Sequence, residues 1–324
     1  LDLHHSAPQT GVVLPRHRLV ACLVAAIWGA NFLAIHASLA QFPPLFLVAL
    51  RFALIAVPTV LFVPRPAVAW RWLIGYGVGF GVLQFTFLYT GMAAGMPAGL
   101  ASLVLQASGP ITLALGAGLL GERVRPRQWV GVATALGGLA LVGVSRAANA
   151  GLVPFLLVLA GAAGWALGNL ANRLARPDSA LRLTLWMSIV VPIPMLAASL
   201  VVEGPAAIAQ SLATSLSPAA GPAWIGLAYT VVIGTIVGSG LWTWLMSRYP
   251  AGTVAPFSML VPVVGIAGAA LTLGEWPTPL ELAGGLVVIT GVLVGAGRPG
   301  VAVREHDESP LKAGIEPDGA LEAV

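Results

Sequence analysis

Long apolar runs separated by short polar turns make up most of the chain. Each run is close to about 20 residues, the length that an α-helix needs to cross the hydrocarbon core of a bilayer. The turns contain pairs that end helices, such as Pro43-Pro44 and Arg176-Pro177. The pattern predicts ten membrane-spanning helices, over residues 19–38, 45–63, 72–93, 98–120, 128–145, 152–174, 181–202, 222–247, 252–273 and 280–297.

Composition supports an all-α integral membrane protein whose main partner is the lipid bilayer. The chain is 58% hydrophobic and 9% charged, whereas soluble domains carry about a quarter charged residues. The single cysteine, Cys22, lies in an apolar run, which excludes a disulfide framework. The sequence has no phosphate-binding GxxxxGK[ST] loop and no cluster of metal ligands, so we expect no cofactor, no metal and no ATP hydrolysis by this chain.

The arginines and lysines fall almost entirely on one side once the turns are assigned alternately to the two faces of the membrane. Arg146 alone takes the other side, and Arg51 lies within a span. Because cytoplasmic turns are enriched in cations, both termini are predicted to be cytoplasmic. The net charge of +4 is then a topology signal, and no nucleic-acid partner is expected. A signal peptide is the alternative for the first run, but that run is too long and nine more follow.

The segment from Met96 to Val144 recurs 153 positions later, from Tyr249 to Gly297. The shared positions include Pro97 with Pro250, Gly121 with Gly274, Glu122 with Glu275, Pro126 with Pro279 and Gly138 with Gly291. Such in-register agreement indicates a duplicated unit. Since each half holds five spans, an odd number, the two repeats must be inverted in the membrane. The predicted organisation is a tail over 1–18, repeats over 19–145 and 151–297, and a disordered cytoplasmic tail over 298–324.

Five segments carry a resemblance to a known family: WGANFLAIHASL, PPLFLVALRF, GMPAGLASLVLQ, LGERV and APFSMLVPVVGIAGAAL. They resemble the EamA-type exporters of the drug/metabolite transporter superfamily, and most closely the bacterial inner-membrane exporters of cysteine and O-acetylserine. The resemblance implies ten spans in two EamA repeats, a bacterial inner-membrane location and export of a small molecule. The substrate stays open, because one fold serves several substrates.

A small polar substrate needs hydrogen-bonding partners at mid-membrane depth, where an unsatisfied polar group costs several kcal/mol. Polar and aromatic side chains on helix faces that can meet are therefore the candidate binding residues. They are Trp28, Asn31, Gln84, Tyr89, Gln106, Trp165, Asn169, Trp242 and Ser258. The structural alternative is that these groups only bond helix to helix, at roughly 0.6 kcal/mol each, or that the tryptophans lie at the membrane interface.

Three charged residues have both a functional and a structural interpretation. Arg51 is a cation inside a span, and the Arg51-Phe52 pair matches a recurring feature of the resembled family. It is an anchor for a substrate carboxylate or, as we favour at this point, a link between helices. Glu122 and Glu275 each follow a glycine at the end of a span. We expect them to cap helices or pair with arginine, with a gating role as the alternative.

Together these features predict a monomeric, alternating-access exporter of small amino acids or related metabolites. Its central cavity would be formed by the first, third, fourth, sixth, eighth and ninth spans. No Ser/His/Asp constellation or carboxylate pair suggests an enzyme, and no catalytic residue is expected. A multidrug or other metabolite exporter and a passive channel are the alternatives. No carboxylate lies at mid-span, so a carboxylate proton relay is not predicted.

Overall fold

The computed structural model describes residues 13–122, 124–149, 151–249 and 251–296. Within these ranges every regular element is a helix, which confirms the all-α prediction. The predicted C-terminal tail, 298–324, and residues 1–12 of the predicted N-terminal tail lie outside the described residues. The first helix begins at Pro15, four residues before the predicted start, because proline fits the first turn of a helix, where no backbone donor is needed.

Several spans are made of more than one helical segment. The first half begins with α1 (Pro15–Leu39) and α2 (Pro44–Phe62). Next, α3 (Trp70–Tyr76) continues through a π-helical segment (Gly77–Leu83) into α4 (Gln84–Ala93), and α5 (Ala98–Val104) continues through a 3₁₀ turn (Leu105–Ala107) into α6 (Ser108–Leu120). The half ends with α7 (Pro126–Asn149). The second half contains α8 (Val153–Ala175), α9 (Ala180–Met187), a 3₁₀ turn (Ser188–Val190), α10 (Pro192–Val202), α11 (Pro205–Ala213), a 3₁₀ turn (Pro218–Ala220), α12 (Gly221–Ala228), a π-helical segment (Tyr229–Val237), α13 (Gly238–Met246), α14 (Ala251–Val254), a 3₁₀ segment (Ala255–Met259), α15 (Leu260–Leu273) and α16 (Pro279–Ala296).

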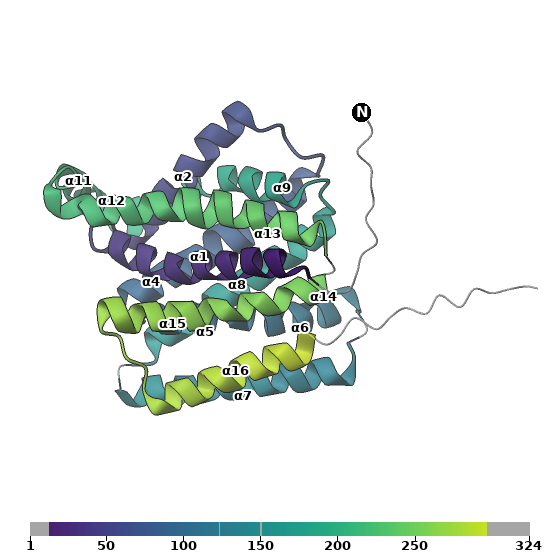
Figure 1. The fold of residues 1–324 in the computed structure, drawn as a ribbon. Helices are drawn as coiled ribbons and strands as arrows, with labels where there is room; N and C mark the ends of the chain where they lie inside the picture. Colours follow the sequence, from purple (N-terminus) through teal and green to yellow (C-terminus); the bar gives the residue numbers. More distant parts are fainter. Residues whose placement is uncertain (1–12, 123, 150, 250, 297–324) are drawn as a thin grey trace, which may run out of the picture.

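These segments combine into ten membrane-spanning helices. Nine described stretches are long and apolar enough to cross a bilayer, and the tenth, Pro279–Gly295, is a shorter apolar helix. The third span is α3–α4, the fourth α5–α6, the seventh α9–α10, the eighth α12–α13 and the ninth α14–α15. The short helix α11 was not predicted; it lies between the seventh and eighth spans (Figure 1).

The two halves repeat in structure as well as in sequence. At the same offset of 153 residues, the π-helical segment Gly77–Leu83 corresponds to part of Tyr229–Val237. Gly121 and Gly274 both end their helices in the left-handed conformation, at φ 64° and 69°, a conformation that favours glycine. With five spans in each half, the two repeats are inverted relative to one another.

Helices α7 and α16 run side by side along one edge of the bundle (Figure 1). Their backbones touch through repeat-related glycines. A Cβ on Gly138 would lie 2.6 Å from the carbonyl oxygen of Gly284, and one on Gly291 would overlap the backbone nitrogen of Ala135. Small residues at such crossings give close van der Waals packing, on which association of helices in lipid depends.

The third and sixth spans also cross at close range. A Cβ on Gly168 would lie 2.7 Å from the backbone nitrogen of Phe80, and one on Gly164 would lie 2.8 Å from that of Gln84. Helix α8 is therefore held directly against the π-helical segment and α4. This contact fixes the position of α8, and with it the side chains that α8 directs into the bundle.

Candidate functional site

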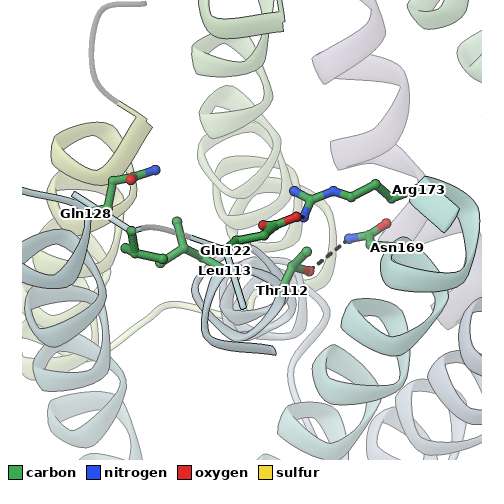
Figure 2. A pocket seen from close by; sticks show the side chains of 8 residues that line it. Thr112, Leu113, Glu122, Gln128, Asn169 and Arg173 are labelled. Carbon is green, nitrogen blue, oxygen red and sulfur yellow. Dashed lines mark hydrogen bonds and ion pairs between the residues drawn. The ribbon is translucent and has the colours of Figure 1, made fainter. Parts of the chain in front are cut away.

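A cavity of about 320 Å³ opens at the end of the bundle where α6 and α8 finish (Figure 2). We call this end the Glu122 end, and the opposite one the Glu275 end. The cavity lies between α6, the start of α7 and α8. Its lining residues are Gly109, Thr112, Leu113, Glu122, Val124, Gln128, Asn169 and Arg173. Of the predicted site residues, Glu122 and Asn169 line it.

An ion pair forms one wall of the cavity. Nη1 of Arg173 lies 2.6 Å and 2.7 Å from the two carboxylate oxygens of Glu122. Gly116 leaves room for the pair, since a Cβ there would lie 2.7 Å from a Glu122 oxygen. The side chains are 50% and 41% exposed, and exposed pairs contribute only about 0–1 kcal/mol to stability. The pair is therefore easily opened.

Polar groups continue from the cavity along α8. Asn169 donates through Nδ2 to the hydroxyl of Thr112 at 3.2 Å, and Figure 2 shows this bond beside the ion pair. Residues four apart on a helix share one face, so Trp165, Asn169 and Arg173 form one stripe. Deeper in the bundle, the Trp165 ring lies 5.9 Å from the ring of Phe80.

Arg51 is a cation buried in the bundle interior, with 5% of its surface exposed. It donates through Nη1 to the Tyr89 hydroxyl at 2.8 Å and through Nη2 to the Thr235 hydroxyl at 3.1 Å. Its guanidinium carbon lies 4.1 Å from the centre of the Phe85 ring, a cation–π contact. No carboxylate in the described residues pairs with it, and its Nε is buried without a hydrogen-bond partner.

Other buried polar atoms also lack partners. Among the described residues, they include Asn31 Oδ1, Gln84 Oε1 and Thr230 Oγ1. A Cβ on Gly234 would lie 2.7 Å from the Asn31 oxygen, so Asn31 faces the π-helical segment that also supplies Thr235 to Arg51. An unsatisfied buried polar group costs about 1–3 kcal/mol. Several of them together leave hydrogen-bonding capacity inside the bundle that a polar ligand can use.

The remaining candidates join spans of opposite repeats. Trp28 donates through Nε1 to the Gly234 carbonyl at 3.0 Å, and its ring lies 5.2 Å from that of Trp242. Gln106 donates through Nε2 to the Ser258 carbonyl at 3.2 Å. The structure therefore links the first span to the eighth and the fourth to the ninth through residues that the sequence pattern singled out.

Two carboxylates hold helix N-termini at the Glu275 end. Glu275 accepts a hydrogen bond from the backbone nitrogen of Ala98 at 2.8 Å. Glu203 accepts from the backbone nitrogens of Leu45 and Phe46, at 2.6 Å and 3.1 Å, and from the Ser199 hydroxyl at 2.5 Å. Carboxylates are favoured at helix N-termini because free amides and the helix dipole converge there.

Sequence reasoning missed several of these groups. Arg173 was considered only for its side of the membrane, although its spacing of four from Asn169 could have placed it on the same stripe. Glu203 was not singled out, because its partners lie about 158 residues away in sequence and no local pattern connects them. Thr112 and Gln128 were also missed as site residues.

The part of the chain that the structure describes consists of helices in ten apolar spans, with unpaired polar groups inside and a charged cavity at one end. This is the architecture of a multi-pass membrane transporter. The EamA-like transporter family matches residues 17–144 and 152–295. The chain belongs to this family, which confirms the resemblance found in its sequence, and it is a transporter and not an enzyme.

Two relatives and one solved structure show how far the likeness extends. A "Probable amino-acid metabolite efflux pump" of Escherichia coli (strain K12) is 41% identical over 283 residues, covering 85% of this chain and 93% of the relative. The "Uncharacterized inner membrane transporter YedA" of the same organism is 24% identical over 84% of this chain and 88% of its own length. A crystal structure at 20% identity aligns with a TM-score of 0.58 over 86% of this chain and 96% of its own, which supports the fold alone.

Proposed function

We propose that this protein exports small amino acids or related metabolites from the bacterial cytoplasm across the inner membrane. The names of the relatives support the substrate class and the location. The clustering of cations on one face supports cytoplasmic termini. One chain carries both repeats, 19–145 and 151–297, so we propose that it works as a monomer and that these repeats are the moving units.

The observation that carries the proposal is the state of Arg51. Two of its nitrogens hold Tyr89 and Thr235, which accounts for a role in linking helices. Its Nε has no partner, and no described carboxylate balances its charge. A buried, uncompensated guanidinium is complementary to a carboxylate that arrives with a substrate. The unpaired oxygens of Asn31 and Gln84 suit the donors of the same molecule.

Alternating access is supported by the difference between the two ends. The Glu122 end is hollowed by the cavity, whereas Glu275 and Glu203 tie helices together at the other end. By the distribution of cations the cavity faces the cytoplasm. We propose that Glu275 acts as an outer gate that releases Ala98 when the transporter opens outward. Glu122, its equivalent in the other repeat, would act at the inner end.

The test is uptake of radiolabelled amino acids into proteoliposomes, with and without a pH gradient. Wild-type protein is expected to give saturable flux of several amino acids. Arg51→Gln should abolish it, and Arg51→Lys should retain only a minor part, because lysine keeps the charge without the planar fork. Arg182→Gln is the matched control, since Arg182 bonds Asp178 outside the cavity.

Other outcomes separate the alternatives. Unsaturable flux with measurable conductance would identify a passive channel. Flux of dyes or drugs without flux of any amino acid would favour the multidrug alternative. Full amino-acid transport by Arg51→Gln would reduce Arg51 to a link between helices.

A further inference from the structure

We infer that the cavity at the Glu122 end is a recognition subsite for zwitterionic α-amino acids, in which Arg173 binds the substrate carboxylate and Glu122 binds its ammonium group. The inference rests on the proposed function and deepens it, because it names the chemical form that is admitted. It concerns a separate place from Arg51, since Arg51 is buried and does not line this cavity.

The geometry of the ion pair leaves the guanidinium open on one side. Both oxygens of Glu122 approach the same nitrogen of Arg173, Nη1. No described residue accepts a hydrogen bond from Nε or Nη2 of Arg173. These two nitrogens form the fork that binds a carboxylate through two parallel bonds. Arg173 can therefore take a second carboxylate without first releasing Glu122.

The other wall suits an ammonium group. A carboxylate has about four lone-pair sites, and Arg173 uses two contacts on Glu122. The Oδ1 atom of Asn169 has no described partner, since its bond to Thr112 is made through Nδ2. An ammonium group with three donors can thus reach Glu122 and Asn169 together. Leu113 and Val124 give the same cavity an apolar wall for a side chain.

Occupation of the cavity costs little. Opening or sharing an ion pair whose side chains are 50% and 41% exposed forfeits at most a weak interaction. The volume of about 320 Å³ lies at the lower end of the usual range for small-molecule sites, about 300–1,000 Å³. A molecule without the carboxylate cannot bond Arg173, and one without the ammonium group cannot bond Glu122. The subsite therefore distinguishes zwitterions from singly charged analogues.

The subsite is also connected to Arg51 through side chains that contact one another. Arg173, Asn169 and Trp165 succeed one another on α8 at intervals of one turn. Trp165 meets Phe80, whose ring lies 5.6 Å from that of Phe85, and Phe85 stacks on Arg51. A chain of side chains in contact therefore joins Arg173 at the cavity to Arg51 in the interior.

The experiment measures inhibition of uptake in proteoliposomes and compares each amino acid with two analogues. The probes are L-alanine, L-leucine and L-phenylalanine, each alongside its amide, which lacks the carboxylate, and its N-acetyl form, which lacks the ammonium group. Wild-type protein should bind both analogues at least tenfold more weakly than the parent. The variants are Arg173→Gln and Glu122→Gln, with Asp178→Asn as control, because Asp178 forms an equally short ion pair outside the cavity.

Each variant has its own expected signature. Arg173→Gln should raise KM for the parent at least tenfold with kcat changed less than twofold, and should lose discrimination against the amide alone. Glu122→Gln should lose discrimination against the N-acetyl form alone. Asp178→Asn should match wild type in KM, in kcat and in discrimination against both analogues. The subsite would be overturned if Arg173→Gln lost discrimination against the N-acetyl form and Glu122→Gln against the amide. It would also be overturned if neither variant lost any discrimination.

The test separates this inference from the function beneath it. Saturable amino-acid flux with unchanged KM and discrimination in both cavity variants would sink the subsite and leave the exporter intact. No flux of any amino acid by folded wild-type protein would overturn both. Size-exclusion profiles and melting temperatures of the variants show whether each is folded, and Arg173→Lys, which keeps the charge, should fall between wild type and Arg173→Gln.

Discussion

Glu122 and Glu275 occupy equivalent positions in the two repeats but have different partners. Each follows a left-handed glycine, and each backbone nitrogen bonds a carbonyl six residues earlier, in Gly116 and Ala269. Beyond the backbone they diverge. Glu275 holds the N-terminus of α5 through Ala98, whereas Glu122 pairs with Arg173 at the rim of a cavity. The same local sequence therefore binds a helix N-terminus at one end and forms an exposed ion pair at the other.

The glycines of α7 and α16 show the opposite behaviour. Gly138 and Gly291 are also equivalent in the repeats, and both keep the same role at one helix crossing. The difference has a physical cause. Close backbone packing tolerates no Cβ in either copy, while a carboxylate takes whichever donor the surrounding helices offer. A duplicated sequence thus predicts packing better than it predicts polar partners.

The largest loss of stability is expected when the repeat-equivalent glycines, Gly138 and Gly291, are replaced by a larger residue. Gly138→Val and Gly291→Val should each lower stability by about 1–3 kcal/mol or more, because the added carbons overlap backbone atoms of the other helix. Melting temperatures in detergent measure the effect. Gly137→Val is the control, since a Cβ there meets nothing within 4 Å.

The comparison predicts that the two glycine variants are destabilised to a similar degree. A large loss for one and none for the other would show that the crossing is not symmetric. A loss in Gly137→Val equal to that in Gly138→Val would point to helix propensity as the cause and not to packing.

Much of the fold was predictable from the sequence because its signals are local. The length of the apolar runs predicted the spans, and the recurrence of residues such as Gly121 and Gly274 predicted the repeat. The odd number of spans in each half predicted its inversion. The π-helical segments were not predicted, since an extra residue in a helical turn leaves the apolar run unbroken. Part of the predicted residue set also meets in space, as Gln106 and Ser258 do. Arg173 and Glu203 were missed because their roles depend on which helices become neighbours.

The second-largest loss of stability is expected when the carboxylates at the Glu275 end are removed. Glu203→Ala and Glu275→Ala should each destabilise the protein by about 0.5–2 kcal/mol, the usual cost of removing an N-terminal cap. Glu203 accepts from two backbone nitrogens and a hydroxyl, whereas Glu275 accepts from one described nitrogen. Glu203→Ala should therefore melt at the lower temperature of the two. The reverse order would mean that the number of bonds does not set the cost.

The smallest stability effect is expected at Glu122. Glu122→Gln should shift the melting temperature less than either cap variant, because its partner Arg173 is half exposed and solvent already screens the pair. Raising the salt concentration should reduce even this difference, since exposed charges are screened over about 8–10 Å at physiological ionic strength. Asp178→Asn, which breaks another exposed pair, is the matched control. If Glu122→Gln instead destabilised the protein as much as Glu275→Ala, the two carboxylates would be structural equivalents after all. A small shift in stability together with altered discrimination between amino acids and their analogues would place the difference between the repeats in recognition.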